Sequence, residues 1–125
     1  LLNTVEDGLD MVARVGHPRF KIHYDTHHAH IEEQDPDAAI RAGAGAIGHV
    51  HISESDRGVP GRGQVAWEAT FEALKEIDYD GWMVIEAFSR RDPDFANAIH
   101  VWRDYAPADE IWREGLEFIR RSWVS

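Results

Sequence analysis

The chain has 125 residues, about the length of one ordinary domain, and we expect residues 1–125 to form a single domain. Hydrophobic residues make up 43% of the chain. It has no cysteine, which excludes a disulfide scaffold and a cysteine zinc site. No apolar run approaches the length of about 20 residues that a membrane helix needs, which excludes a membrane helix. A formal charge of −10 argues against nucleic-acid binding, which needs a clustered positive surface. We therefore expect a cytoplasmic protein.

The first helix is predicted to begin at Thr4-Val5-Glu6-Asp7, which has the form of a capping box, and to end at Gly16. A strand is expected over about Phe20 to Asp25. Its odd positions, Lys21, His23 and Asp25, share one face, because side chains alternate along a strand. We expect the strand to be followed by a loop that carries three histidines: His27, His28 and His30.

A second helix is predicted to begin at Asp35-Pro36-Asp37, since aspartate caps helices and proline is tolerated at the first helical position. The next strand, about Ile47 to Ile52, places His49 and His51 on one side. A polar, glycine-rich loop follows from Ser53 to Gly63. It contains two arginines, Arg57 and Arg62, which we expect to be solvated unless the loop folds over a substrate.

The last part of the chain contains a third helix, a third strand and two further helices. The third helix has an apolar face of Trp67, Phe71 and Leu74, and the strand spans about Trp82 to Glu86. Because that run is mostly apolar, we expect it to be covered on both faces. One helix begins at Asp92 and continues to about Arg103. The final helix begins near Asp109, and its Trp112 and Trp123 are expected to pack in the core.

Helices and strands therefore alternate, which predicts an α/β fold with a parallel sheet and right-handed crossovers. In such sheets functional groups gather beyond the carboxyl ends of the strands. Asp25, His51 and Glu86 each end a predicted strand, so we expect them to meet as ligands of Mn²⁺, Mg²⁺, Co²⁺ or Zn²⁺. The alternatives are that Asp25 is a cap and that His51 is a packed histidine. Glu86 is harder to explain otherwise, because an unpaired buried carboxylate is costly.

Several motifs, taken together and in this order, resemble the C-terminal half of the D-tagatose/D-psicose 3-epimerase family of xylose-isomerase-like TIM barrels. They are Asp25-Thr26-x-His28-x-x-Ile31-Glu32-Glu33, Gly48-His49-x-His51, Glu54-x-x-Arg57, Pro60-Gly61-x-Gly63, Trp67, Tyr79-Asp80-Gly81, Glu86-x-Phe88 and Val101-Trp102-Arg103-Asp104. The resemblance implies a partial (β/α)8 barrel. It corresponds to roughly the last three β/α units, with a parallel three-stranded sheet and outer helices.

The resemblance also implies a reaction: C3 epimerisation of a ketose through an enediolate, assisted by a divalent metal that is usually Mn²⁺. By position, Asp25, His51 and Glu86 resemble the metal ligands, and Glu86 also resembles a catalytic acid or base. His28 and Arg57 resemble groups that hold substrate oxygens, and Phe88 resembles an apolar wall beside the sugar. His27 and His30 are expected to take no part.

The chain departs from the family pattern in two places. Ser55 and Asp56 stand where cysteine and asparagine are expected, and His27 stands where an aromatic residue is usual. A fourth metal ligand, a glutamate, is expected upstream of Leu1. We therefore expect a fragment of a longer protein or a homo-oligomer, inactive or nearly so as the isolated chain.

Other functions remain open within the same fold: hydroxypyruvate isomerase, inosose dehydratase and, least favoured for an acidic chain, apurinic endonuclease. A non-catalytic metal- or sugar-binding remnant is a further alternative.

Overall fold

The computed structural model describes residues 2–125. In this range the chain forms six helices and three strands. In chain order they are α1 (Val5–Val15), β1 (Ile22–Asp25), α2 (Thr26–Glu32), α3 (Pro36–Ala42), β2 (Ile47–Ile52), α4 (Trp67–Glu76), β3 (Met83–Ile85), α5 (Pro93–Ala98) and α6 (Ala108–Val124).

The three strands form one parallel sheet in the order β1-β2-β3, as predicted from the alternation of helices and strands. Asp25 at the end of β1 is the register partner of His51 on β2. His51 is in turn opposite Val84 on β3. The register therefore aligns the carboxyl ends of the strands, which is the arrangement on which the predicted site depends.

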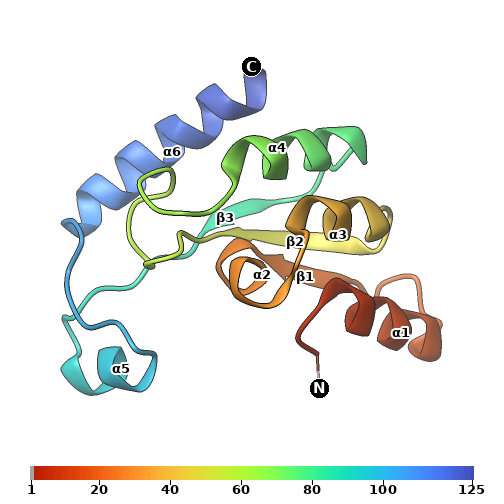
Figure 1. Cartoon of the computed structure of the whole chain (residues 1–125), viewed down its shortest axis with the longest axis horizontal. Helices are drawn as coiled ribbons and strands as arrows, with labels where there is room; N and C mark the ends of the chain where they lie inside the picture. Colours follow the sequence, from red (N-terminus) through yellow and green to blue (C-terminus); the bar gives the residue numbers. More distant parts are fainter. Residues whose placement is uncertain (1) are drawn as a thin grey trace.

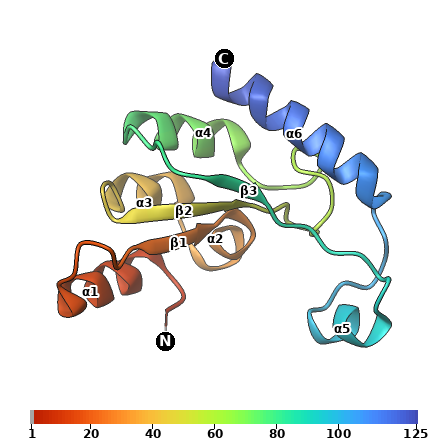
Figure 2. The same ribbon diagram turned by 180° about the vertical axis from the view of Figure 1, so that it is seen from behind.

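One face of the sheet is covered by α3, α4 and α6, which lie side by side in Figure 1. The core lies between these helices and the sheet and includes Tyr24, Val50, Ile52, Phe71 and Leu74, all at most 3% exposed. Since strand side chains alternate, Tyr24, Val50 and Ile52 point to this layer and their neighbours point away from it. Figure 2 shows the strands from the opposite side, with β2 in front of α3.

The histidines that follow β1 lie on a helix, so the predicted loop is wrong. Asp25 is the N-cap of α2 and accepts hydrogen bonds from the backbone N–H groups of His27 and His28. The segment lacks the periodic apolar stripe by which an amphipathic helix is predicted. Its one large apolar residue, Ile31, is 61% exposed. The capping carboxylate and the burial of Thr26 and Ala29 hold this short helix instead.

Three other expectations need correction. The helix from Asp92 ends at Ala98 rather than near Arg103, because His100 adopts a left-handed backbone conformation with a φ of 61°. β3 is not covered on both faces within the described chain, since Val84 is 40% exposed. Trp112 is 48% exposed and lies outside the core, whereas Trp123 packs against Phe71 as expected.

None of the helices in the described part of the chain combines the length and the apolar character that crossing a membrane demands.

Candidate active site

Asp25, His51 and Glu86 meet at the carboxyl ends of the three strands, as the sequence predicted. His51 Nδ1 lies 3.5 Å from Asp25 Oδ2 and 3.3 Å from Glu86 Oε1. Asp25 ends β1, His51 lies near the end of β2, and the N–H of Glu86 donates to the carbonyl of Ile52, which holds Glu86 just beyond β3. All three side chains are between 11% and 28% exposed, so they are accessible from solvent but largely enclosed.

Asp25 is a helix cap and a member of this group at the same time. Its Oδ1 accepts from the N–H of His27 at 2.8 Å and of His28 at 3.1 Å. Its Oδ2 remains directed at His51. The two readings of Asp25 from sequence were therefore not exclusive: the cap fixes the carboxylate so that its second oxygen faces the site.

Arg57 reaches into the site from the loop that follows β2. Its Nη1 donates to Glu86 Oε2 at 2.6 Å and lies 3.8 Å from Asp25 Oδ2. Ser53 Oγ accepts a further bond from the same nitrogen at 3.0 Å. The backbone of Arg57 has a φ of 65°, a conformation that is strained for a residue with a Cβ and that recurs at functional sites. This arginine is therefore built into the site and is not a solvated loop charge.

His28 and Phe88 both contact the guanidinium of Arg57. The Nη2 of Arg57 is 3.2 Å from His28 Nε2, and because arginine only donates, this histidine nitrogen accepts. The Arg57 Cζ lies 5.1 Å from the centre of the Phe88 ring, a cation–π distance. The structure thus brings all six predicted site residues into one contact network.

The remaining loop and helix residues are placed away from this network. Arg62 pairs with Glu110 and Glu114 on α6 and is half exposed, as expected of a surface arginine. His30 is exposed on α2. His27 is half-buried, and its Nδ1 is 3.0 Å from the carbonyl oxygen of Glu54. Burial and the charge of Arg57 lower the pKa of His27, against the opposing effect of that carbonyl.

Glu54 is a structural residue of the site whose role was missed in the sequence. It is fully buried, and its carboxylate accepts four hydrogen bonds, from the backbone N–H groups of Ser55, Gly61 and Val65 and from the indole of Trp67. Burial alone would raise the pKa of Glu54, but these four bonds outweigh it and hold the pKa below its ordinary value. The loop that presents Arg57 is therefore folded around a buried anion.

The glycine at position 63 of the Pro60-Gly61-x-Gly63 motif follows from the same anion. A Cβ added at Gly63 would lie 2.5 Å from Glu54 Oε1, so only glycine lets the loop backbone pass this close to the carboxylate. A glutamate that precedes a glycine-rich loop is the sequence signal from which this arrangement could have been predicted.

Two further histidines, His23 and His49, lie beside His51 on the open face of the sheet. The ring centroids of His23 and His51 are 4.0 Å apart, and those of His23 and His49 are 5.0 Å apart. Burial lowers the pKa of His23, as do the neighbouring His51 and His49 rings. The sequence placed His49 and His51 on one side of their strand but did not predict that His23 joins them, because that depends on the register between β1 and β2.

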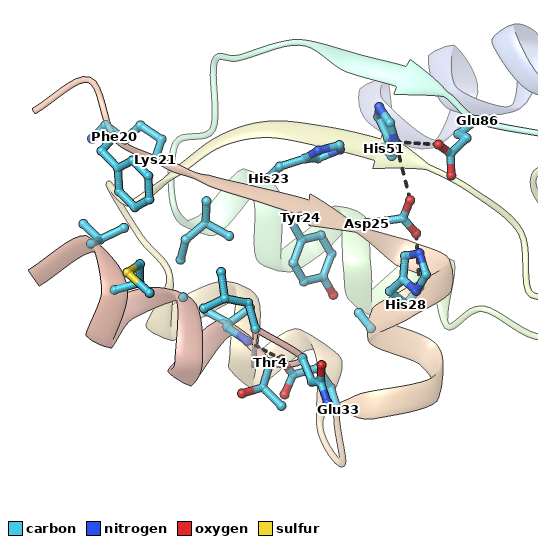
Figure 3. Close-up of a pocket in the computed structure, with 18 residues that line it drawn as sticks. Thr4, Phe20, Lys21, His23, Tyr24, Asp25, His28, Glu33, His51 and Glu86 are labelled. Carbon is cyan, nitrogen blue, oxygen red and sulfur yellow. Dashed lines mark hydrogen bonds and ion pairs between the residues drawn. The ribbon is translucent and has the colours of Figure 1, made fainter. Parts of the chain in front are cut away.

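A pocket of about 440 Å³ runs along β1 and ends at Asp25, His51 and Glu86. Its volume lies in the range of small-molecule sites, about 300–1,000 Å³. Figure 3 shows that Asp25, His28, His51 and Glu86 lie at one end of the pocket and α1 lies along its side. β1 and α1 form the walls of this pocket, and the polar group lies at the end of it.

The polar group has the donor chemistry of a metal site. Its ligand atoms, one nitrogen and two carboxylate oxygens, all lie within 4.8 Å of one another. Adjacent ligands of an ion with bonds of about 2.1 Å lie about 3 Å apart. The separations of 3.3 Å and 3.5 Å from His51 are close to that value, so Asp25, His51 and Glu86 fit a divalent cation.

Comparison with known proteins agrees with the motifs. Residues 1–122 match the family model described as "Xylose isomerase-like TIM barrel". A probable ketose 3-epimerase of Synechocystis is 37% identical over 98% of this chain and 43% of its own length. The D-psicose 3-epimerase of Ruminiclostridium cellulolyticum is 42% identical over 88% of this chain and 38% of its own length.

The fold is shared with solved structures of the same class. A crystal structure of D-allulose 3-epimerase from Methylomonas in complex with D-allulose superposes with a TM-score of 0.89 at 38% identity, covering 96% of this chain and 43% of that one. The chain thus spans less than half the length of the relatives it matches. The resemblance to ketose 3-epimerases is confirmed, and the chain belongs to the xylose isomerase-like TIM barrel family.

Proposed function

We propose that this chain carries the metal-binding and proton-transfer side of a metal-dependent ketose 3-epimerase. The observation that carries the proposal is the convergence of Asp25, His51 and Glu86 at the ends of three parallel strands, beside a pocket open to solvent. The similarity to ketose 3-epimerases supports this function over hydroxypyruvate isomerase, inosose dehydratase and a non-catalytic remnant.

In this proposal Asp25 and His51 hold the cation, and Glu86 both holds it and moves the proton. Asp25 is suited to holding, because two backbone hydrogen bonds fix its Oδ1. Glu86 is bound only through side chains, so its carboxylate is freer to turn toward a substrate. When bound, the cation, Mn²⁺ by preference, supplies Lewis-acid stabilisation of negative charge on the sugar oxygens.

Glu86 removes the proton from C3, and the electron pair of the C–H bond moves toward the neighbouring carbonyl, which gives the enediolate of the sugar. Arg57 donates to sugar oxygens in this step, His28 accepts from a sugar hydroxyl through the nitrogen that now accepts from Arg57, and Phe88 packs against the apolar side of the ring. Arg57 must exchange its bond with Glu86 for a bond to the substrate, which frees the carboxylate when the sugar is in place.

Inversion at C3 requires a second acid that returns the proton to the opposite face. Among residues 2–125, Glu86 is the carboxylate of the site that is suited to this chemistry, since Asp25 is committed to capping α2. We therefore propose that the second acid–base group is supplied from outside these residues, and that the 125-residue chain alone has little or no epimerase activity.

A chimaera tests this function directly. The matching segment of the Synechocystis ketose 3-epimerase is replaced by this chain, and C3 epimerisation of fructose and tagatose is assayed with added Mn²⁺. The proposal predicts turnover by the chimaera, loss of turnover in its Glu86→Gln version, and retention in its Glu117→Gln version, since Glu117 is exposed on α6. A well-folded chimaera without turnover, or turnover that survives Glu86→Gln, would overturn the proposal. Substantial turnover by the isolated chain would overturn the part of it that places the second acid–base group outside these residues.

A further inference from the structure

The open face of the sheet carries a second cluster of metal-ligating side chains, formed by His23, His49 and His51. His23 on β1 is the register partner of His49 on β2, and His51 lies two residues further along β2 on the same face. Neighbouring strands are about 4.8 Å apart, so this register forces three imidazoles into one small volume. The cluster is thus a product of this register, which shifts by one residue between Ile22 and His23.

The three rings meet edge to face and are not stacked. Their centroids are 4.0 Å, 5.0 Å and 5.3 Å apart, and the planes cross at 72° to 82°. One nitrogen of each ring lies within 4.8 Å of the others. Atoms this close fit inside a circle of about 2.8 Å radius, compared with about 2.0–2.1 Å for a zinc–nitrogen bond. Small side-chain rotations are therefore enough to bring all three nitrogens onto one ion.

We propose that His23, His49 and His51 form a nitrogen-only site for Zn²⁺, Cu²⁺ or Ni²⁺, which differs in its ligands from the site of Asp25, His51 and Glu86 and shares His51 with it. Imidazole ligands suit these ions, whereas carboxylate-containing sets suit Mn²⁺ and Mg²⁺. His23 is exposed, so a fourth ligand position is open to water, as in sites where three histidines bind zinc.

The two sites share His51, and this has a consequence for the proposed function. An ion held by His23 and His49 draws the His51 ring to itself and places a second positive charge a few ångströms from the carboxylate site. Both effects weaken Mn²⁺ binding by Asp25 and Glu86. The histidine site is therefore antagonistic: occupancy by zinc lowers the affinity of the neighbouring site for manganese.

Zinc titration calorimetry of the purified chain tests the site. His23→Ala and His49→Ala are each expected to weaken zinc binding by roughly tenfold or more, whereas His30→Ala, an exposed histidine on α2, leaves it unchanged. Glu86→Gln, which disables the carboxylate site, is expected to leave zinc affinity within about twofold. Circular dichroism establishes that each variant is folded. Zinc affinity that is unchanged in both histidine variants, or that falls as far in Glu86→Gln, would overturn the proposal.

Competition distinguishes this inference from the proposed function. Free Mn²⁺ has an electron paramagnetic resonance signal that bound Mn²⁺ lacks, so zinc should release Mn²⁺ from the parent chain and need a higher concentration to do so in His23→Ala. Equal zinc dependence in the two proteins would contradict the antagonism. If the chain failed to bind Mn²⁺ at all, the function proposed above would fail, while the calorimetric test of the histidine site would stand unaffected.

Discussion

Glu86 uses its two carboxylate oxygens in different directions. Its Oε2 accepts from Arg57 Nη1 at 2.6 Å, while its Oε1 lies 3.3 Å from His51 Nδ1. One carboxylate thus links a cationic side chain to the candidate metal ligands. This relationship makes Arg57 both a neighbour and a competitor of any cation bound there.

Arg57→Ala should therefore bind Mn²⁺ more tightly. The substitution frees Glu86 from its ion pair and removes a positive charge 3.8 Å from Asp25. A gain of about 1 kcal/mol, the upper end for partly exposed ion pairs, corresponds to about fivefold in affinity. Calorimetric titration measures this, with Arg62→Ala as the control, because Arg62 belongs to the same loop but pairs with α6. A weaker affinity for Mn²⁺ in Arg57→Ala would show that the ion pair orients Glu86 and does not compete.

Two substitutions separate the roles of Asp25. Asn caps helices about as well as Asp, so Asp25→Asn should retain the unfolding free energy within about 0.5 kcal/mol while it loses most Mn²⁺ affinity. Asp25→Ala removes the cap as well, and should lower the unfolding free energy by about 1 kcal/mol more, the typical cost of losing a helix cap. Urea unfolding and calorimetry on the same samples give both quantities. Full Mn²⁺ affinity in Asp25→Asn would leave Asp25 as a cap alone.

Glu54→Gln is expected to destabilise the fold and to release the loop that presents Arg57. A glutamine has one acceptor oxygen in place of two, so its amide nitrogen would face two of the four donors that now point at the carboxylate. Leaving two buried donors unpaired costs about 1–3 kcal/mol each. Chemical denaturation measures the loss, and Glu68→Gln, an exposed position on α4, is the control.

The stability of Glu54→Gln should also depend less on pH in acid than that of the parent chain. The pKa of Glu54 is lower in the folded chain than in the unfolded one, so the carboxylate stabilises the fold fully above its unfolded pKa of about 4.3. That stabilisation disappears as the pH falls through the lower folded pKa. Unfolding free energy of the parent chain should thus fall below about pH 4.3 more steeply than that of Glu54→Gln. Parallel curves would mean that the four hydrogen bonds do not favour the charged form.

The open sheet predicts association of the isolated chain. β1 and β3 are both edge strands in the described residues, and Trp82 and Val84 beside or on β3 are 78% and 40% exposed. Unpaired strand edges and uncovered apolar side chains promote contact between copies. Size-exclusion chromatography with light scattering should detect species larger than 14.2 kDa. A stable, monodisperse monomer would show that the exposed edges are tolerated.

The main features of the site could be predicted because they depend on chain order. Parallel strands align their carboxyl ends, so a carboxylate or imidazole that ends each predicted strand is brought to one place whatever the details of packing. This is why Asp25, His51 and Glu86 were identified from sequence. Helix α2 was missed because its stability comes from the cap of Asp25 and not from a periodic apolar stripe.

The role of Glu54 and the histidine cluster depended on information that the sequence does not contain locally. The donors to Glu54 include Val65 and Trp67, which lie eleven and thirteen residues away and reach it only after the loop folds back. His23 meets His49 because of an irregularity in the register between Ile22 and His23. Alternation gives the face of a strand, but tertiary packing decides the register.

Mn²⁺ titration calorimetry of the parent chain and Glu86→Gln tests whether Asp25, His51 and Glu86 together hold a divalent cation. We expect one bound Mn²⁺ per chain and an affinity loss of about tenfold or more in Glu86→Gln, with Glu117→Gln unchanged. Equal Mn²⁺ affinity in the parent chain and in Glu86→Gln would contradict it.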